Sequence, residues 1–284
     1  MAPVLAGAVP LAAWQAGLVT ARRSQLRTAL PPAVRTVVAG RVARLAWENE
    51  VGGLTYEVGA GPDRCFVKWT PAASGIDLGK EAARLAWAAP FIAVPRLLSH
   101  GRDDAGSWIV TAALPGQNAA STRWKAEPRT AVTAIGEGLR AMHDALPVAA
   151  CPFSWTAEDR LAEIRGRAGE GRIDPASWDD VHQPLGISRA LELLADIPAA
   201  DQLVVCHGDS CAPNTLLTGD GCWSGHVDLG ELGIADRWAD LAVATWSTEW
   251  NYGPGWDGLL LDAYGVPPDT DRTKYYRLLW DLGP

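Results

Sequence analysis

The sequence lacks the surplus of basic residues that binding to nucleic acid requires. Lysine and arginine number 25 against 33 aspartate and glutamate residues, so the formal net charge is −8 at pH 7. Proteins that hold phosphate backbones do so with clustered Lys and Arg side chains. A nucleic-acid partner is therefore not expected, and a cationic small molecule suits this balance better. An acidic excess of this size can equally serve solubility alone.

Paired cysteines are missing as well, as are histidine clusters that could hold a metal ion. The five cysteines are odd in number and form no CxxC pair, which argues against a disulfide framework and against a zinc site. They are Cys65, Cys151, Cys206, Cys211 and Cys222. This usage predicts a reducing compartment, the cytoplasm.

No stretch of the sequence is long and apolar enough to span a membrane, so none is expected to do so. Residues 1–19 carry no formal side-chain charge, but the basic segment of a signal peptide is missing and Pro10 interrupts the apolar run. We interpret these residues as an amphipathic N-terminal segment. Repeats and low-complexity tracts are also lacking, and 284 residues with 48% hydrophobic side chains fit one large or two small globular domains.

The two halves of the chain differ in periodicity. Residues 35–114 contain short β-rich runs that predict strands, at residues 37–39, 55–58, 65–68 and 108–111, between glycine and Pro-Asp turns. One helix is predicted over Leu78 to Ala89 and ended by Pro90. Beyond a Leu-Pro-Gly segment the pattern is mainly helical, with helices predicted over residues 131–144, 160–167, 188–196 and 238–250. The sequence thus predicts an α+β fold, with a sheet-based part in residues 1–114 and a larger, mainly helical part in residues 115–284.

A polar loop in the second half has the composition of a phosphoryl-transfer site. It reads HGDSCAPN from His207 to Asn214 and follows a predicted strand. An Asp and an Asn five residues apart can orient a hydroxyl beside a carboxylate and hold Mg²⁺ between phosphate oxygens. A second carboxylate, Asp228, ends the next predicted strand, and oxygen ligands of this kind suit Mg²⁺. A capping turn would explain Asp209 alone, but it does not explain the joint pattern.

The segments HGDSCAPN and HVDLGELGIADRWADLA resemble the catalytic and metal-binding segments of bacterial aminoglycoside phosphotransferases, especially those acting on 3′ or 3″ hydroxyls. A looser likeness covers most of the chain. It implies a two-lobed fold similar to that of protein kinases, with nucleotide held between the lobes. It also implies that Asp209 is the catalytic base, that Asn214 and Asp228 hold magnesium, and that the γ-phosphate of a nucleoside triphosphate moves to a hydroxyl of an antibiotic, which confers resistance.

The first half of the chain contains residue types with which a kinase holds nucleotide phosphates. Lys68 ends a β-rich run, and Glu81 lies on the predicted helix thirteen residues later. A strand lysine paired with a helical glutamate grips the α- and β-phosphates in kinases. Gly52 and Gly53 offer two amides that could approach phosphate, although they form no GxGxxG or Walker sequence and a tight hairpin explains them equally well.

The resemblance also implies a place for the nucleotide base. Residues 108–114, including Thr111 and Ala113, would form the hinge that binds the base through backbone groups. The donor is ATP or GTP, and the sequence does not distinguish them.

We assign four residues to the antibiotic substrate: Glu231, Asp236, Trp250 and Asp281. Carboxylates would bind its amino groups, and a flat ring such as Trp250 can stack on sugars or heterocycles. Glu231 stands where related 3′-kinases usually carry Arg, and the chain ends with fewer acidic residues than those enzymes. A less cationic antibiotic, such as a nucleoside type with a free sugar hydroxyl, is therefore the first alternative substrate.

Other functions remain open from the residues alone. A metabolic small-molecule kinase, for a sugar or choline, would use the same machinery. A pseudokinase that binds nucleotide without turnover would have lost the base, the lysine or a metal ligand, and all of these are present. A protein kinase would need an activation segment before an Ala-Pro-Glu sequence, which is not visible here. Monomer and dimer are both compatible with the sequence.

Overall fold

The computed structural model of the protein describes residues 30–49 and 51–283. Within this range the chain divides into two compact units, which we call the sheet unit and the helical unit. The sheet unit comprises residues 30–90 and 94–114, and the helical unit comprises residues 91–93 and 115–283. The N-terminal segment predicted to be amphipathic, residues 1–19, lies outside the described residues.

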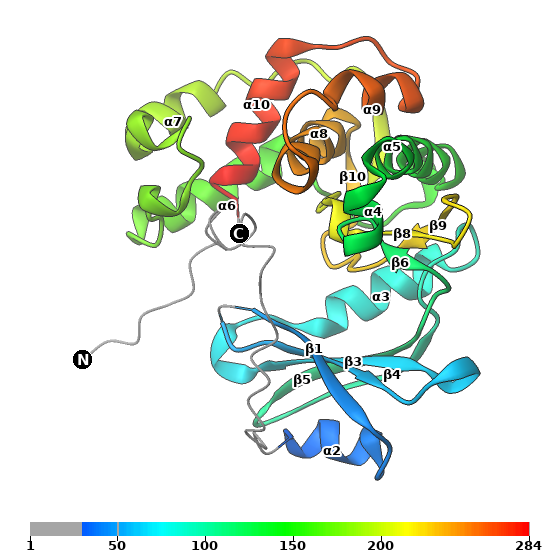
Figure 1. The fold of residues 1–284 in the computed structure, drawn as a ribbon. Coiled ribbons are helices and arrows are strands. Elements are labelled where there is room, and N and C mark those ends of the chain that lie inside the picture. Colours follow the sequence, from blue (N-terminus) through cyan, green and yellow to red (C-terminus); the bar gives the residue numbers. More distant parts are fainter. Residues whose placement is uncertain (1–29, 50, 284) are drawn as a thin grey trace. The chain divides into compact units, whose positions relative to one another are not determined.

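The sheet unit is an antiparallel five-stranded sheet in the order β1-β2-β3-β5-β4, with one helix against each face (Figure 1). Its elements are α2 (Pro32–Val38), β1 (Ala43–Glu48), β2 (Leu54–Val58), β3 (Cys65–Pro71), α3 (Leu78–Ala88), β4 (Leu97–Asp103) and β5 (Gly106–Ala112). The two short 3₁₀ turns are η1 (Gly61–Asp63) and η2 (Ala72–Ser74).

Alternation along β3 directs neighbouring side chains to opposite faces of this sheet. Val67 is buried in a small core with Val34 and Val38 of α2. Lys68, the next residue, pairs with Glu81 of α3 on the other side. The sequence therefore places one apolar and one functional side chain on the two faces of a single strand.

The helix α3 forms as the sequence predicts, whereas α2 replaces a predicted strand. The side chain of Asp77 caps α3 by accepting a hydrogen bond from Gly79 N, and Pro90 follows its end. Residues 37–39 have the β-branched composition of a strand, but Pro32 starts a short helix there. The burial of Val34 and Val38, one helical turn apart, outweighs local strand propensity.

The helical unit contains seven α-helices and five short strands among the residues described. Its helices are α4 (Thr122–Ala126), α5 (Pro128–Ala145), α6 (Ala157–Gly169), α7 (Gly186–Leu194), α8 (Trp238–Tyr252), α9 (Asp257–Tyr264) and α10 (Thr270–Asp281). Its strands are β6 (Gln117–Asn118), β7 (Leu203–Cys206), β8 (Thr215–Leu217), β9 (Trp223–His226) and β10 (Gly233–Asp236). The 3₁₀ turns are η3 (Val148–Ala150), η4 (Pro175–Ser177), η5 (Gln183–Leu185) and η6 (Ala212–Asn214).

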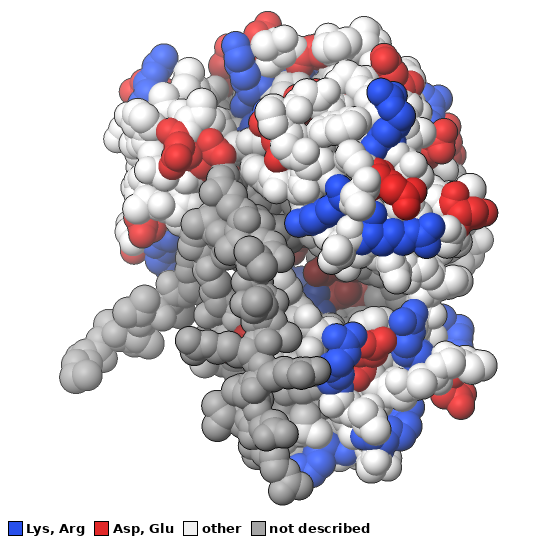
Figure 2. Space-filling view, in the orientation of Figure 1, with Lys and Arg blue, Asp and Glu red and all other residues white. Residues whose placement is uncertain are grey.

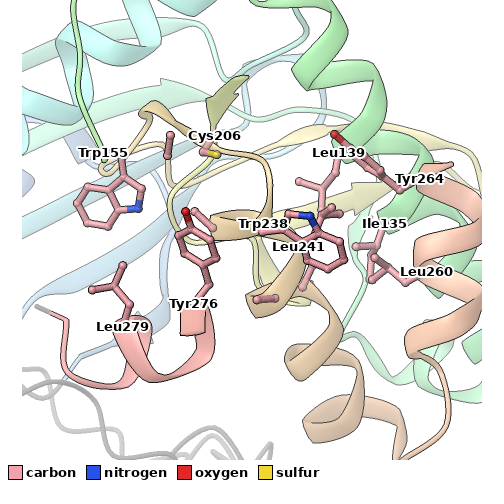
Figure 3. Packing of buried hydrophobic residues seen from close by; sticks show 14 of the residues in the cluster. Ile135, Leu139, Trp155, Cys206, Trp238, Leu241, Leu260, Tyr264, Tyr276 and Leu279 are labelled. Carbon is pink, nitrogen blue, oxygen red and sulfur yellow. The ribbon is translucent and has the colours of Figure 1, made fainter. Parts of the chain in front are cut away.

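One continuous core holds the helical unit together. Figure 3 shows Ile135 and Leu139 of α5 near Leu260 and Tyr264 of α9, with Trp238 of α8 beside them. Each of these side chains is almost wholly inaccessible to solvent. Burying a large apolar side chain stabilises a fold by about 1.5–3 kcal/mol, so this core gives the short strands between the helices a rigid support.

Charges on the surface are mixed in sign. On the face drawn in Figure 2, acidic and basic side chains are interspersed over the described atoms of both units. None of the described helices combines the length and the apolar composition needed to cross a membrane. None of the five cysteines, all of which lie in the described part of the chain, forms a disulfide.

Candidate active site

The loop that carries Asp209 connects a two-stranded sheet to a three-stranded sheet in the helical unit. β7 pairs antiparallel with β10, and the chain then passes through the loop and η6 into β8, which pairs with β6 and β9. Val227 N donates to Asn214 O at 2.9 Å, directly after β9. This hydrogen bond brings the start of the Asp228 segment beside Asn214, although the two residues are fourteen positions apart.

The predicted base and the two predicted metal ligands therefore come from adjoining segments. Asn214 Nδ2 donates to Asp209 Oδ2 at 2.9 Å and to the Asp209 carbonyl oxygen at 2.9 Å. Asp209 Oδ1 is buried and has no hydrogen-bond partner among the described residues. Asp228 is exposed and has a left-handed backbone with φ of 61°. A non-glycine residue with this φ is uncommon and often occurs at functional sites.

The charge of Asp209 is held in an unfavourable environment. Burial raises the pKa of Asp209, because water that would solvate the carboxylate is excluded, and the negative charge of Asp228 acts in the same direction. The neighbouring Cys211 thiol and, to a smaller extent, the hydrogen bond from Asn214 oppose this shift. A carboxylate with one unsatisfied oxygen and a raised pKa is suited to accept a proton from a hydroxyl placed beside it.

Asp240, on the first turn of α8, orders the backbone just before Asp209. Its two carboxylate oxygens accept from His207 N at 2.6 Å and from Gly208 N at 3.0 Å. The Asp240 carbonyl oxygen accepts from Ser210 Oγ at 2.7 Å. His143 of α5 binds Asp240 Oδ2 through Nε2 at 2.9 Å. Three loop residues are thus tied to one wholly buried residue, which fixes the position of Asp209 between them.

His207 stabilises the loop and is neutral in this arrangement. Its Nδ1 accepts from Asp209 N at 3.2 Å, so this nitrogen carries no proton. Its Nε2 lies 2.9 Å from Val227 O, which can only accept, so Nε2 carries the proton and donates. The imidazole therefore joins the Asp209 loop to the Asp228 segment.

The sheet unit forms the ion pair that the sequence predicts. Lys68 Nζ on β3 lies 2.9 Å from Glu81 Oε2 on α3, and the lysine side chain remains partly exposed while that of Glu81 is buried. The glutamate holds the ammonium group in one place without covering it. The role of this pair in binding phosphate stays a prediction.

The glycines of the sheet unit form the tight hairpin between β1 and β2. Asn49 N donates to Gly53 O at 2.9 Å, and Gly52, with φ of 80°, donates from its N–H to Asn49 O at 3.1 Å. The positive φ explains why a glycine occupies position 52. A role for Gly52 and Gly53 beside phosphate stays a prediction.

Some backbone groups of the segment predicted to bind the nucleotide base already have partners within the sheet unit. Thr111 lies inside the sheet, opposite Phe66 of β3 on one side and Leu97 of β4 on the other. Ala113 donates its N–H to Arg64 O at 3.0 Å. The N–H of Ala113 is therefore already used within the sheet unit, and its carbonyl group is what could still bind a base.

Two of the carboxylates assigned to the substrate have partners within the fold. Asp236 is buried and accepts from Asp201 N at 2.7 Å and from Trp238 N at 2.9 Å. Asp281 is also buried, and its Oδ2 lies 2.8 Å from the donor Asp179 N and 2.7 Å from His182 Nδ1. Each carboxylate thus joins segments of the helical unit, and binding of substrate by either residue stays a prediction.

The other two residues assigned to the substrate, Glu231 and Trp250, also lie in the helical unit. Glu231 follows the Asp228 segment, and its backbone packs against Gly208, where an added Cβ would lie 2.4 Å from Glu231 O. Trp250 lies near the end of α8 and is partly exposed. Binding of substrate by either residue stays a prediction.

Sequence reasoning did not predict that Asp240, or any other residue of α8, would hold the Asp209 loop. The available signal was a carboxylate within the apolar run from Trp238 to Val243, since a buried acid inside a helix needs strong partners. Ser247 carries no such signal, yet its Oγ accepts from Ala212 N in η6 at 2.9 Å.

The α+β fold with its strand lysine and helical glutamate, and the loop with Asp209, Asn214 and Asp228, define a phosphotransferase of the protein-kinase type. The sequence profile of the phosphotransferase enzyme family matches residues 47–276, and the chain belongs to this family. It is accordingly an enzyme that transfers a phosphoryl group from a nucleotide to a hydroxyl group.

Individual relatives agree with this membership. An aminoglycoside 3′-phosphotransferase of Streptomyces fradiae is 37% identical over 251 residues, covering 82% of this chain and 91% of that protein. The crystal structure of an aminoglycoside-3′-phosphotransferase of type VIII matches with a TM-score of 0.77 and 32% identity, over 88% of this chain and 96% of that one. Aminoglycoside phosphotransferase APH(3″)-Id from Streptomyces rimosus, in complex with ADP and streptomycin, matches with a TM-score of 0.70 and 27% identity, over 88% and 95% of the two chains.

Proposed function

We propose that this enzyme transfers the γ-phosphate of ATP or GTP to a hydroxyl of an aminoglycoside antibiotic, with Asp209 as the catalytic base. The observation that carries the proposal is the buried Asp209 carboxylate, whose Oδ2 accepts from Asn214 while Oδ1 has no partner among the described residues. An unsatisfied buried acceptor costs about 1–3 kcal/mol or more when charged. A substrate hydroxyl that donates to Oδ1 would remove this cost.

The chemistry of the proposed step is mainly positioning. Asp209 orients the acceptor hydroxyl and takes its proton as the oxygen attacks the γ-phosphorus, and the nucleoside diphosphate leaves. Lys68, held by Glu81, binds the α- and β-phosphates and balances their charge.

The residues at the end of the loop fit a magnesium ion. Asn214 turns Nδ2 toward Asp209, so its amide oxygen is the atom left to bind a cation. Asp228 adds an exposed carboxylate, and Mg²⁺ prefers such oxygen ligands together with phosphate. When bound, the ion would neutralise charge on the phosphate oxygens. The same Asn214 side chain would then link the position of the ion to that of Asp209.

An aminoglycoside acceptor is supported by two further facts. Three similar proteins are aminoglycoside phosphotransferases by name, and one of them has been seen with ADP and streptomycin. The net charge of −8 also favours the approach of a polycationic substrate.

Substitution of the base tests the proposal most directly. Asp209→Asn should lower kcat by about 10²–10⁴-fold, because general-base catalysis is lost while size is retained. Lys68→Met should instead raise the KM for nucleotide. The assay incubates each protein with Mg²⁺, ATP or GTP and a panel of aminoglycosides, and mass spectrometry detects phosphate added to the antibiotic. Undiminished turnover by Asp209→Asn would exclude Asp209 as the base.

A further inference from the structure

Three tryptophans form an aromatic cluster in the helical unit: Trp246 and Trp250 of α8 and Trp280 of α10. The ring centroids lie 5.1 Å apart for Trp246 and Trp250, 5.6 Å for Trp250 and Trp280, and 6.2 Å for Trp246 and Trp280. Trp246 is buried, whereas Trp250 and Trp280 are partly exposed. The two outer rings are therefore the ones that a ligand can reach. We call these three residues the tryptophan cluster.

The tryptophan cluster is joined to the Asp209 loop by a single helix. Ser247 of α8 accepts from Ala212 N, which follows the loop. Trp250 lies three residues beyond Ser247, so both project from the same side of the helix, about 4.5 Å apart along its axis. The helical face that supports the loop with the base thus continues directly into the exposed ring of Trp250.

The acidic residues around the tryptophan cluster already have basic partners. Arg277 of α10 binds Glu249 at 3.1 Å and Asp257 at 3.2 Å. Asp281 is paired with His182, whose ring in turn meets Trp246 edge-on with centroids 5.6 Å apart. Two carboxylates share one guanidinium, so Arg277, Glu249 and Asp257 together keep one net negative charge. These carboxylates are therefore not free to bind single amino groups of a substrate.

Arg277 also shows that a ring of the tryptophan cluster can hold a guanidinium group. Its guanidinium carbon lies 5.4 Å from the centroid of the Trp246 ring. A flat cation at this distance is attracted by the negative face of the indole ring. One ring of the cluster thus holds a guanidinium from within the chain, and the two partly exposed rings offer the same kind of surface.

We propose that Trp250 and Trp280 bind a flat cationic group of the acceptor, such as a guanidinium, by stacking. This inference rests on the proposed function and specifies the substrate class: an aminoglycoside with a guanidino group is preferred over one whose cations are all amines. An ammonium group is compact and strongly hydrated, whereas a guanidinium is planar and loses less hydration when it stacks. The local negative charge adds attraction for either cation, so the rings supply the discrimination.

Paired substitutions test this inference while retaining side-chain bulk. Trp250→Leu and Trp280→Leu remove the aromatic face, and Trp250→Phe and Trp280→Phe keep one. The Kd of streptomycin, whose guanidino groups are flat cations, is measured by calorimetry and compared with that of an aminoglycoside that carries only amines. Each leucine variant should weaken streptomycin binding by about 2- to 30-fold and each phenylalanine variant by less, with the all-amine compound changing little. Thermal unfolding confirms that each variant is folded.

The binding assay separates failure of this inference from failure of the proposed function. Equal loss for both compounds, unchanged affinity in the leucine variants, or no binding of streptomycin by the native enzyme would each overturn the inference. A nucleoside antibiotic with an uncharged base is tested in the same way. If the leucine variants weakened its binding as much as that of streptomycin, a flat ring without charge would be sufficient, and the requirement for a cation would be overturned. None of these results requires turnover. Loss of phosphate transfer to every acceptor, with binding intact, would instead count against the proposed function.

Discussion

At the scale of single residues, Asp240 shows how one buried carboxylate positions a functional side chain that it does not touch. It accepts the backbone N–H groups of His207 and Gly208, the two residues before Asp209. Burial alone would raise the pKa of Asp240, but the hydrogen bond and charge of His143, together with the hydrogen bond from the His207 backbone N–H, hold this pKa below its ordinary value of 3.8. The ionised form is therefore favoured by folding.

This lowered pKa gives a pH dependence with a definite sign. As the pH falls, the unfolded chain binds a proton at Asp240 before the folded chain does. The contribution of Asp240 to the free energy of unfolding is thus complete above pH 3.8 and is lost as the pH falls toward the lowered value. Urea titrations from about pH 5 to about pH 3 should show a steeper loss of stability for the native protein than for Asp240→Asn.

The same variant has an effect at neutral pH. The amide introduced by Asp240→Asn would present one acceptor oxygen to two backbone donors, so one buried N–H would lose its partner at a cost of about 1–3 kcal/mol. If Asp240→Asn kept the native slope with pH and the native stability, the loop would not depend on this carboxylate.

At the scale of elements, the turn that follows β7 and contacts α8 requires a glycine. Gly208 has φ of 87°, and a Cβ built there would lie 2.4 Å from the backbone oxygen of Glu231. Both the backbone conformation and the close approach exclude a side chain. The loop can therefore reach Asp240 on one side and the Glu231 segment on the other only when this position is a glycine.

Replacement of Gly208 by alanine should displace Asp209 and lower activity. Gly208→Ala is expected to reduce kcat by at least about tenfold and to destabilise the fold by about 1–3 kcal/mol, since strain at a functional turn has this size. Gly166→Ala is the matched control, because Gly166 is exposed within α6 and nothing lies within 4 Å of its added Cβ. That change should leave kcat unaltered and stabilise by about 0.5–1 kcal/mol. Steady-state kinetics and thermal unfolding measure both effects, and equal kcat values in the two variants would contradict the role of Gly208.

At the scale of the whole molecule, the net negative charge should attract a cationic substrate before it binds. A net charge of −8 attracts a polycationic acceptor and repels the nucleotide. Salt screens both interactions, because the Debye length shortens as ionic strength rises.

Raising the salt concentration from about 50 mM to about 500 mM should increase the KM for the cationic acceptor. The KM for nucleotide, measured at a constant Mg²⁺ concentration, should rise less or fall, and it serves as the internal control. Identical changes in both KM values would show that the overall charge does not steer the acceptor.

Most elements and the loop could be predicted because their signals are local. Helical periodicity predicted α3, α5 and α8, and β-rich composition predicted β3 and β5. The predicted strand at residues 37–39 is instead part of α2, because the contact of Val34 and Val38 with the sheet is not visible in a short segment of sequence. The contacts that Asp236 and Asp281 make within the fold could not be predicted for a similar reason, since their partners Asp201 and His182 lie 35 and 99 residues away along the chain.

The sequence by itself determined the class of fold, the membership of a kinase-like family, and the loop in which Asp209 and Asn214 lie five residues apart. These properties depend on residue type and on separations of a few residues, which a chain carries before it folds. Only the tertiary structure decided which carboxylates serve the fold and which aromatic rings remain accessible. Pairing of Arg277 with Glu249 and Asp257, and of Asp240 with His143 and the loop, needs segments far apart in sequence to meet. Burial and partner choice arise from packing, and packing exists only in the folded chain.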